Sequence, residues 1–208
     1  MTGRLNIPNM LTLSRLFLVG LMLFFLESSI PYGKSLALVA FIVSGITDFL
    51  DGYLARTRYG VTSFGQLMDP LADKVMICAA FVSLAAIRLP TQSTPLMPAW
   101  IVVIIISREF LVTGLRLLAA NQGKVIAAGQ WGKHKTVWQV FAVVVLLLGL
   151  AIRFDLMGGS TAQDLQKFDL ALDHIGFAVG IAVTMITAAS GAIYFTEHMG
   201  LVSRHLGR

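Results

Sequence analysis

The chain has 208 residues, of which 56% are hydrophobic and 13% are charged, and its mean hydropathy is +0.78. This composition excludes an ordinary soluble domain and is typical of a protein embedded in a lipid bilayer. The formal net charge of +5 would favour a nucleic-acid partner for a soluble protein. Here the basic residues lie in short segments between apolar runs, so membrane orientation and anionic ligands explain them better, and we expect no nucleic-acid partner.

Six apolar runs follow one another along the chain. About 20 helical residues, at a rise of 1.5 Å each, cross a hydrocarbon core of about 30 Å. Segments rich in glycine, proline and polar residues separate the runs, and no soluble domain intervenes. The sequence therefore predicts one all-α integral membrane domain over residues 1–208, with spans at about 10–27, 36–55, 70–89, 97–119, 135–153 and 174–195.

The residues before the first run alternate between apolar and polar types. Leu5 and Ile7 alternate with Arg4 and Asn6, a pattern that predicts a short helix lying in the membrane interface. Arg15 interrupts the start of the first run, and no small-residue cleavage site follows the run. We therefore expect a retained span and not a cleaved signal peptide.

The basic residues are distributed unevenly between the two sides of the membrane. Six spans place both termini on the same side. On the other side, the basic residues are fewer and are diluted by four aspartates. The bias predicts that the termini face the cytoplasm, and the compact chain suits a bacterial inner membrane. The basic residues on the side of the termini are Arg4, Arg56, Arg58, Lys124, Lys133, Lys135, Arg204 and Arg208.

Four aspartates flank the break between the second and third runs. Asp48 and Asp51 are three positions apart, and Asp69 and Asp73 are four apart. These spacings place each pair on one face of a helix, and a short loop lets the two helices lie antiparallel with the pairs facing each other. Four carboxylates at the edge of a bilayer repel one another and lose hydration, so a cation is needed between them.

Carboxylate ligands without cysteine or histidine favour hard cations such as Mg²⁺ or Mn²⁺. Four carboxylates can hold two ions about 3.5–4 Å apart, the arrangement that clamps a phosphate during in-line displacement. Gly52, Ala55 and Gly65 are small enough for a bulky ligand to approach the helices, and Arg56 suits its phosphates. Each feature alone is typical of packing, anchoring or capping. The full set predicts a two-metal site for a bulky ligand that carries phosphates.

The segment from Asp48 to Asp73 reads D-x2-D-G-x2-A-R-x8-G-x3-D-x3-D. It resembles the complete signature of the CDP-alcohol phosphatidyltransferases, without departure. The resemblance implies a six-helix membrane enzyme, usually a homodimer, that binds CDP-diacylglycerol through its pyrophosphate and two metal ions. It also implies that Asp48, Asp51 and Asp69 are metal ligands and that Asp73 is the general base and touches a metal. In this chemistry the acceptor hydroxyl attacks the phosphorus that bears the diacylglycerol, and CMP leaves without a covalent enzyme intermediate.

Charged residues also interrupt the fourth run, at Arg108, Glu109 and Arg116. Ionisable groups inside a membrane face a polar cavity or pair with each other, and by default they mark function. The alternative is a buried structural pair between Glu109 and an arginine. Lys133 and Lys135 follow on the cytoplasmic side, where plain anchoring is their alternative role. Together the five residues suit an acceptor that carries its own phosphate.

Within the family, the strings R-E-F-x3-G-L-R-x2-A-A, G-K-x-K-T and P-N-x-L-T-x2-R resemble those of the bacterial phosphatidylglycerophosphate synthases. This resemblance runs from Pro8 to about Gln139 and thins out afterwards. It implies glycerol 3-phosphate as the acceptor. Enzymes of the same fold that use inositol phosphate, serine or phosphatidylglycerol are the alternative. A cation transporter is a distant alternative, because intramembrane carboxylates also serve ion transport.

Overall fold

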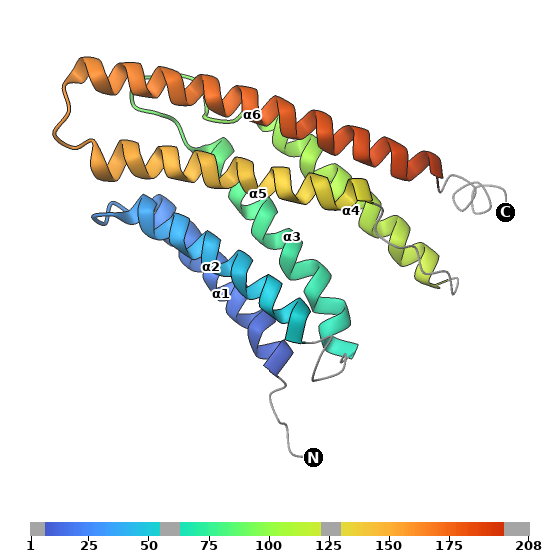
Figure 1. Cartoon of the computed structure of the whole chain (residues 1–208). Coiled ribbons are helices and arrows are strands. Elements are labelled where there is room, and N and C mark those ends of the chain that lie inside the picture. The colour runs from blue at the N-terminus through green and yellow to red at the C-terminus, as the bar shows by residue number, and fades with distance from the viewer. Residues whose placement is uncertain (1–6, 55–62, 122–129, 198–208) are drawn as a thin grey trace.

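The computed structural model describes residues 7–54, 63–121 and 130–197, and these residues form six α-helices (Figure 1). A π-helical turn, η2 (Ile152–Leu156), extends the fifth helix. Within the described residues there is no strand, only an isolated antiparallel bridge between Arg88 and Pro95. The all-α fold and the order of the six helices confirm the prediction. The helices are α1 (Ile7–Glu27), α2 (Gly33–Leu54), α3 (Ser63–Ala86), α4 (Ala99–Asn121), α5 (Gln130–Ala151) and α6 (Ala162–Glu197).

Consecutive helices run in roughly opposite directions, and α1–α3 and α4–α6 form two groups that spread apart toward the lower right of Figure 1. α1 packs against α2 and α3, and α6 packs against α4 and α5. α5 joins these two groups because it also packs against α2. The start of α1, the end of α2 and the start of α3 therefore lie at the same end of the helical assembly.

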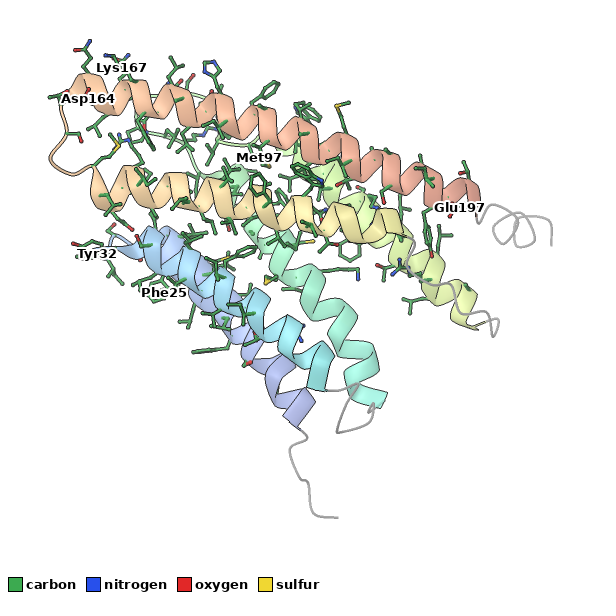
Figure 2. The ribbon with its side chains drawn as sticks, in the orientation of Figure 1. Phe25, Tyr32, Met97, Asp164, Lys167 and Glu197 are labelled. Carbon is green, nitrogen blue, oxygen red and sulfur yellow. The ribbon has the colours of Figure 1, made fainter. Side chains whose placement is uncertain are left out.

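Apolar side chains fill the interior and also cover much of the outside. Phe41, Phe81 and Met97 are fully buried between helices, and Figure 2 shows Met97 inside the assembly. Phe17 and Met185, by contrast, are large apolar side chains on the outer surface. Helices that are apolar on all sides are typical of membrane proteins. By length and composition, two of the described helical segments could cross a membrane, Lys135–Leu156 and Ala162–Glu197.

The helices differ from the predicted spans mainly where they begin. α3 starts at Ser63 instead of near residue 70, and α6 starts at Ala162 instead of near residue 174. Hydropathy marks the apolar part of a helix and misses polar turns that continue the same helix. The predicted interfacial helix is not confirmed, because residues from Ile7 onward belong to α1 itself and residues 1–6 lie outside the described part.

The early start of α6 has a local explanation in its polar residues. Thr161 caps the helix, since its hydroxyl lies 3.3 Å from the backbone N–H of Asp164 and donates to the Asp164 carboxylate at 2.7 Å. One turn further on, Asp169 is fully buried and accepts hydrogen bonds from Arg153 of η2 and from Thr91. The charge that made this segment look like a loop is therefore satisfied by partners inside the fold.

Candidate functional site

The two aspartate pairs occupy helix ends that lie together. Asp48 and Asp51 are in the last two turns of α2, and Asp69 and Asp73 are in the first three turns of α3. α2 contacts α3, and the end of α2 and the start of α3 share one end of the assembly. The four side chains themselves lie outside the described part, so their metal-binding roles stay predictions. The backbone placement fits those roles, because it brings four carboxylate positions to one end, and carboxylates suit a hard divalent cation.

Two of the four residues predicted to bind the CDP-lipid lie in described helices. Gly52 lies in the last turn of α2, and Gly65 lies in the first turn of α3. Ala55 and Arg56 lie outside the described residues. The structure therefore places Gly65 in a helix, where the sequence pattern predicted a loop.

A buried polar cluster centred on Glu109 joins α4 and α5. One carboxylate oxygen of Glu109 accepts hydrogen bonds from the Lys135 ammonium and, at 3.3 Å, from the Gln139 amide. The Arg108 guanidinium lies 3.5 Å from the same oxygen. Glu109 is 7% exposed, and Lys135 is 6% exposed. Lys135 is thus an interior residue of a helix and not a surface anchor, which excludes the plain anchoring role for this residue.

The two arginines of α4 also contact α6. The Nη2 of Arg108 donates a hydrogen bond to the Ser190 hydroxyl at 2.8 Å. The Nε of Arg116 donates to the Tyr194 hydroxyl at 3.3 Å, and its guanidinium lies 5.4 Å from the Tyr194 ring centre. Arg108, Glu109 and Lys135 therefore meet between α4 and α5, and Arg108 and Arg116 both contact α6. The role of these residues in acceptor binding stays a prediction.

This cluster carries more positive than negative charge. Arg108 and Lys135 both contact the Glu109 carboxylate, whereas Arg116 contacts Tyr194. Three cations and one carboxylate leave these four residues with two positive charges in excess. Lys135 is also close enough to Lys74 of α3 to interact with it electrostatically. Because Lys74 directly follows Asp73 in α3, the basic cluster borders the aspartate end. Excess positive charge away from water favours an anionic ligand.

Sequence reasoning missed three members of this cluster. Gln139, Ser190 and Tyr194 are buried polar residues that bind the predicted charged groups. Their only signal in the sequence is a polar side chain inside an apolar run, which is shared by many packing residues. Lys133 lies in the first turn of α5, and its side chain is outside the described part.

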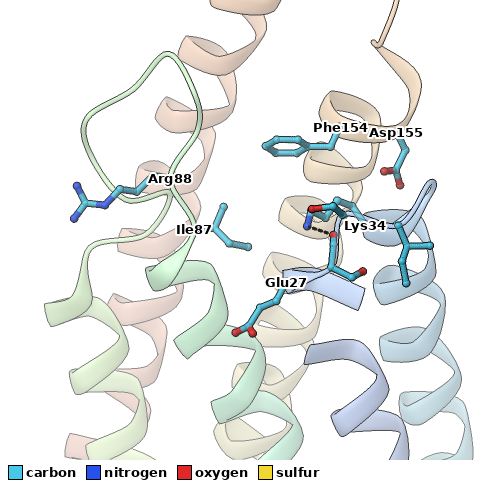
Figure 3. Close-up of a pocket in the computed structure, with 9 residues that line it drawn as sticks. Glu27, Lys34, Ile87, Arg88, Phe154 and Asp155 are labelled. Atoms are coloured by element: carbon cyan, nitrogen blue, oxygen red, sulfur yellow. Dashed lines mark hydrogen bonds between the residues drawn. The ribbon is translucent and has the colours of Figure 1, made fainter. Parts of the chain in front are cut away.

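A second polar region lies at the opposite end of the molecule. A cavity of about 440 Å³ is lined by charged and aromatic side chains that include Glu27, Lys34, Phe154 and Asp155 (Figure 3). Lys34 donates to the Leu26 carbonyl, and Asp155 accepts from the backbone and hydroxyl of Ser35. These charges cap the ends of α1 and α2 and join them to η2, so we assign the region a structural role.

The comparisons with known proteins agree with this geometry. Residues 5–186 match the family model of the CDP-alcohol phosphatidyltransferases. A protein of Bacillus subtilis named CDP-diacylglycerol--glycerol-3-phosphate 3-phosphatidyltransferase is 41% identical over 155 residues, which cover 69% of this chain and 77% of that protein. Proteins of the same name are 38% identical in Haemophilus influenzae, over 69% of this chain and 76% of the relative, and 36% identical in Rickettsia typhi, over 69% and 77%. With the aspartate signature and the basic cluster both inside the matched segment, this chain belongs to the CDP-alcohol phosphatidyltransferase family.

Proposed function

We propose that this chain transfers the phosphatidyl group of CDP-diacylglycerol to glycerol 3-phosphate and releases phosphatidylglycerophosphate and CMP. Relatives that carry the name of this activity are 36–41% identical to it. The observation that carries the proposal is the position of the buried basic cluster next to the aspartate end of α3. In this proposal the aspartate end binds the pyrophosphate, and the neighbouring basic cluster binds the phosphate of the acceptor.

The proposed arrangement in the membrane follows from the alternating helices. We expect all six helices to cross the bilayer of a bacterial inner membrane, with the aspartate end facing the cytoplasm. Apolar outer surfaces on the described helices support this arrangement. The excess of lysine and arginine near that end supports the orientation. A homodimer, as the family resemblance implies, is part of the proposal.

Asp48, Asp51, Asp69 and Asp73 are the proposed ligands of two divalent cations, Mg²⁺ or Mn²⁺. Bound at this position, the cations would neutralise charge on the pyrophosphate and on the departing CMP. Arg56 contacts the phosphates of the CDP-lipid in this proposal, while Gly52, Ala55 and Gly65 leave room for the nucleotide. These assignments rest on the signature and on the helix positions of its members.

Asp73 is the proposed general base that accepts the proton of the acceptor hydroxyl. The hydroxyl oxygen then attacks the phosphorus that bears the diacylglycerol. For the acceptor phosphate we propose the basic cluster, in which Glu109 orients Arg108 and Lys135 while Arg116 and Lys133 add positive charge. Two excess positive charges match the doubly charged phosphate of glycerol 3-phosphate.

The proposal is tested by an assay of the purified protein in detergent with CDP-diacylglycerol and radiolabelled acceptors. We expect transfer to glycerol 3-phosphate and release of CMP, with little transfer to inositol phosphate, serine or phosphatidylglycerol. Preferred transfer to one of those alcohols would show that glycerol 3-phosphate is not the acceptor, while the phosphatidyl-transfer reaction itself would stand. Ion flux through protein-containing liposomes without any transfer would favour a cation transporter and overturn the proposal.

A further inference from the structure

Both arginines of α4 are held by α6, the last helix of the described chain (Figure 1). Arg108 donates to the Ser190 hydroxyl, and Arg116 donates to the Tyr194 hydroxyl one turn further along the same helix face. The Tyr194 ring also lies against the Arg116 guanidinium. Ser190 is 3% exposed and Tyr194 is 6% exposed, so these contacts lie in the interior.

A glycine of α6 lies between these two contacts. A Cβ added at Gly191 would lie 2.9 Å from the Cγ of Arg108, closer than two carbon atoms normally approach. The Arg108 side chain thus lies directly on the α6 backbone, and a larger residue at position 191 would displace it. The Nε of Arg108 is buried and has no hydrogen-bond partner among the described residues. The guanidinium is therefore held through its two terminal nitrogens, by Glu109 and by Ser190.

We propose that Ser190, Gly191 and Tyr194 are positioning residues that fix Arg108 and Arg116 in the geometry needed to bind the phosphate of the acceptor. The inference rests on the proposed function and extends it to α6. These three residues follow residue 186, where the match to the family model ends. The sequence resemblance therefore does not include them, and the packing of α6 on α4 identifies them.

The physical reason is the flexibility of arginine. An arginine side chain has several rotatable bonds, and ordering one such side chain on binding costs about 0.5–1.5 kcal/mol of free energy. Hydrogen bonds and ring stacking from α6 restrict these bonds before the ligand arrives. Loss of a holding contact should therefore weaken binding of the acceptor phosphate, while the CDP-lipid, which binds at the aspartate end, is affected much less.

The test compares Ser190→Ala, Gly191→Ala and Tyr194→Phe with two matched controls. Thr187→Val removes a hydroxyl from a buried position one turn away on α6, where the Thr187 hydroxyl has no hydrogen-bond partner among the described residues. Gly20→Ala adds a methyl group in α1 with no atom within 4 Å of the new Cβ. For each variant, the KM for glycerol 3-phosphate, the KM for CDP-diacylglycerol and the apparent melting temperature are measured.

We expect Ser190→Ala and Tyr194→Phe each to raise the KM for glycerol 3-phosphate by about tenfold, the effect of losing one hydrogen bond to a charged group. Gly191→Ala should raise it as well, because the added methyl group displaces the Arg108 side chain. The KM for CDP-diacylglycerol should change less than twofold, and the controls should match the wild type. An unchanged acceptor KM in all three variants, or equal rises in both KM values with a lowered melting temperature, would overturn the positioning role. If the wild type transfers nothing to glycerol 3-phosphate, the proposed function itself fails, which is a separate outcome.

Discussion

Lys135 of α5 and Glu109 of α4 form an ion pair inside the helical assembly, with side chains only 8% and 9% exposed. The two residues are far apart in the sequence and belong to different helices. Gln139 donates a hydrogen bond to the same carboxylate oxygen of Glu109, and the Arg108 guanidinium lies 3.5 Å from it. Glu109 is therefore the negative charge that balances the cations of this cluster, and its removal should lower stability strongly.

Replacing Glu109 by glutamine should destabilise the protein, because it leaves Lys135 and Arg108 buried without a negative partner. Breaking a buried pair from one side costs about 3–5 kcal/mol. Replacement of both partners, in Glu109→Gln with Lys135→Met, should recover part of this loss. The measurement is the apparent melting temperature in detergent. Strictly additive effects of the two changes would show that the residues do not interact.

Removal of divalent cations should stop the reaction, because the four aspartates of α2 and α3 need cations to bind the pyrophosphate. We expect the purified protein to lose transfer activity in EDTA and to regain it with Mg²⁺ or Mn²⁺. Zn²⁺ should restore less activity, since the predicted ligands are all oxygen atoms. Full turnover in EDTA would contradict the metal assignment.

Asp73→Asn should lower kcat by at least about 100-fold while CDP-diacylglycerol binding is largely kept, because the amide cannot accept the proton of the acceptor hydroxyl. Asp48→Asn is the matched variant and should weaken binding of the CDP-lipid as well as turnover. Single-turnover assays and binding of the CDP-lipid separate the two effects. Equal loss of binding in both variants would reassign Asp73 as a metal ligand alone.

Arg116→Ala should raise the KM for glycerol 3-phosphate by about tenfold, because the variant loses a contact with the acceptor phosphate. The KM for CDP-diacylglycerol should change much less. Lys167→Ala is the control, because Lys167 is an exposed lysine at the start of α6, at the other end of the molecule (Figure 2). Initial-rate kinetics should show a higher KM for glycerol 3-phosphate in Arg116→Ala than in Lys167→Ala. An acceptor KM unaffected by Arg116→Ala would remove this residue from the acceptor site.

Asp169→Asn should lower stability without a specific effect on either substrate. Asp169 is fully buried at the end opposite the aspartate pairs, where it pairs with Arg153 and accepts a hydrogen bond from Thr91. We expect a loss of about 3–5 kcal/mol, seen as a lower melting temperature. Asp173→Asn should cost much less, because Asp173 is only partly buried and the amide oxygen can still accept the hydrogen bond that Thr94 donates. A similar loss in both variants would argue against the importance of burial.

The sequence alone predicted the helices and the family of this protein. Apolar runs of sufficient length predicted six helices in the right order, because helix formation in an apolar setting depends on local composition. The spacing of Asp48, Asp51, Asp69 and Asp73 predicted a shared helix end, since spacings of three and four recur on one helix face. Its errors were local. Hydropathy began the last predicted span only after polar residues such as Asp169, although the folded chain provides partners for them inside the helix.

Only the tertiary structure decided which charged residues meet. Arg108, Glu109 and Lys135 were individually visible in the sequence, but their common contact depends on how α4, α5 and α6 pack. Ser190 and Tyr194 had only a weak signal in the sequence, because a single polar residue in an apolar helix does not show what it faces. Hydrogen bonds to groups distant in the chain form only when helices pack, and for that reason the part of the acceptor site contributed by α6 appears only in the folded molecule.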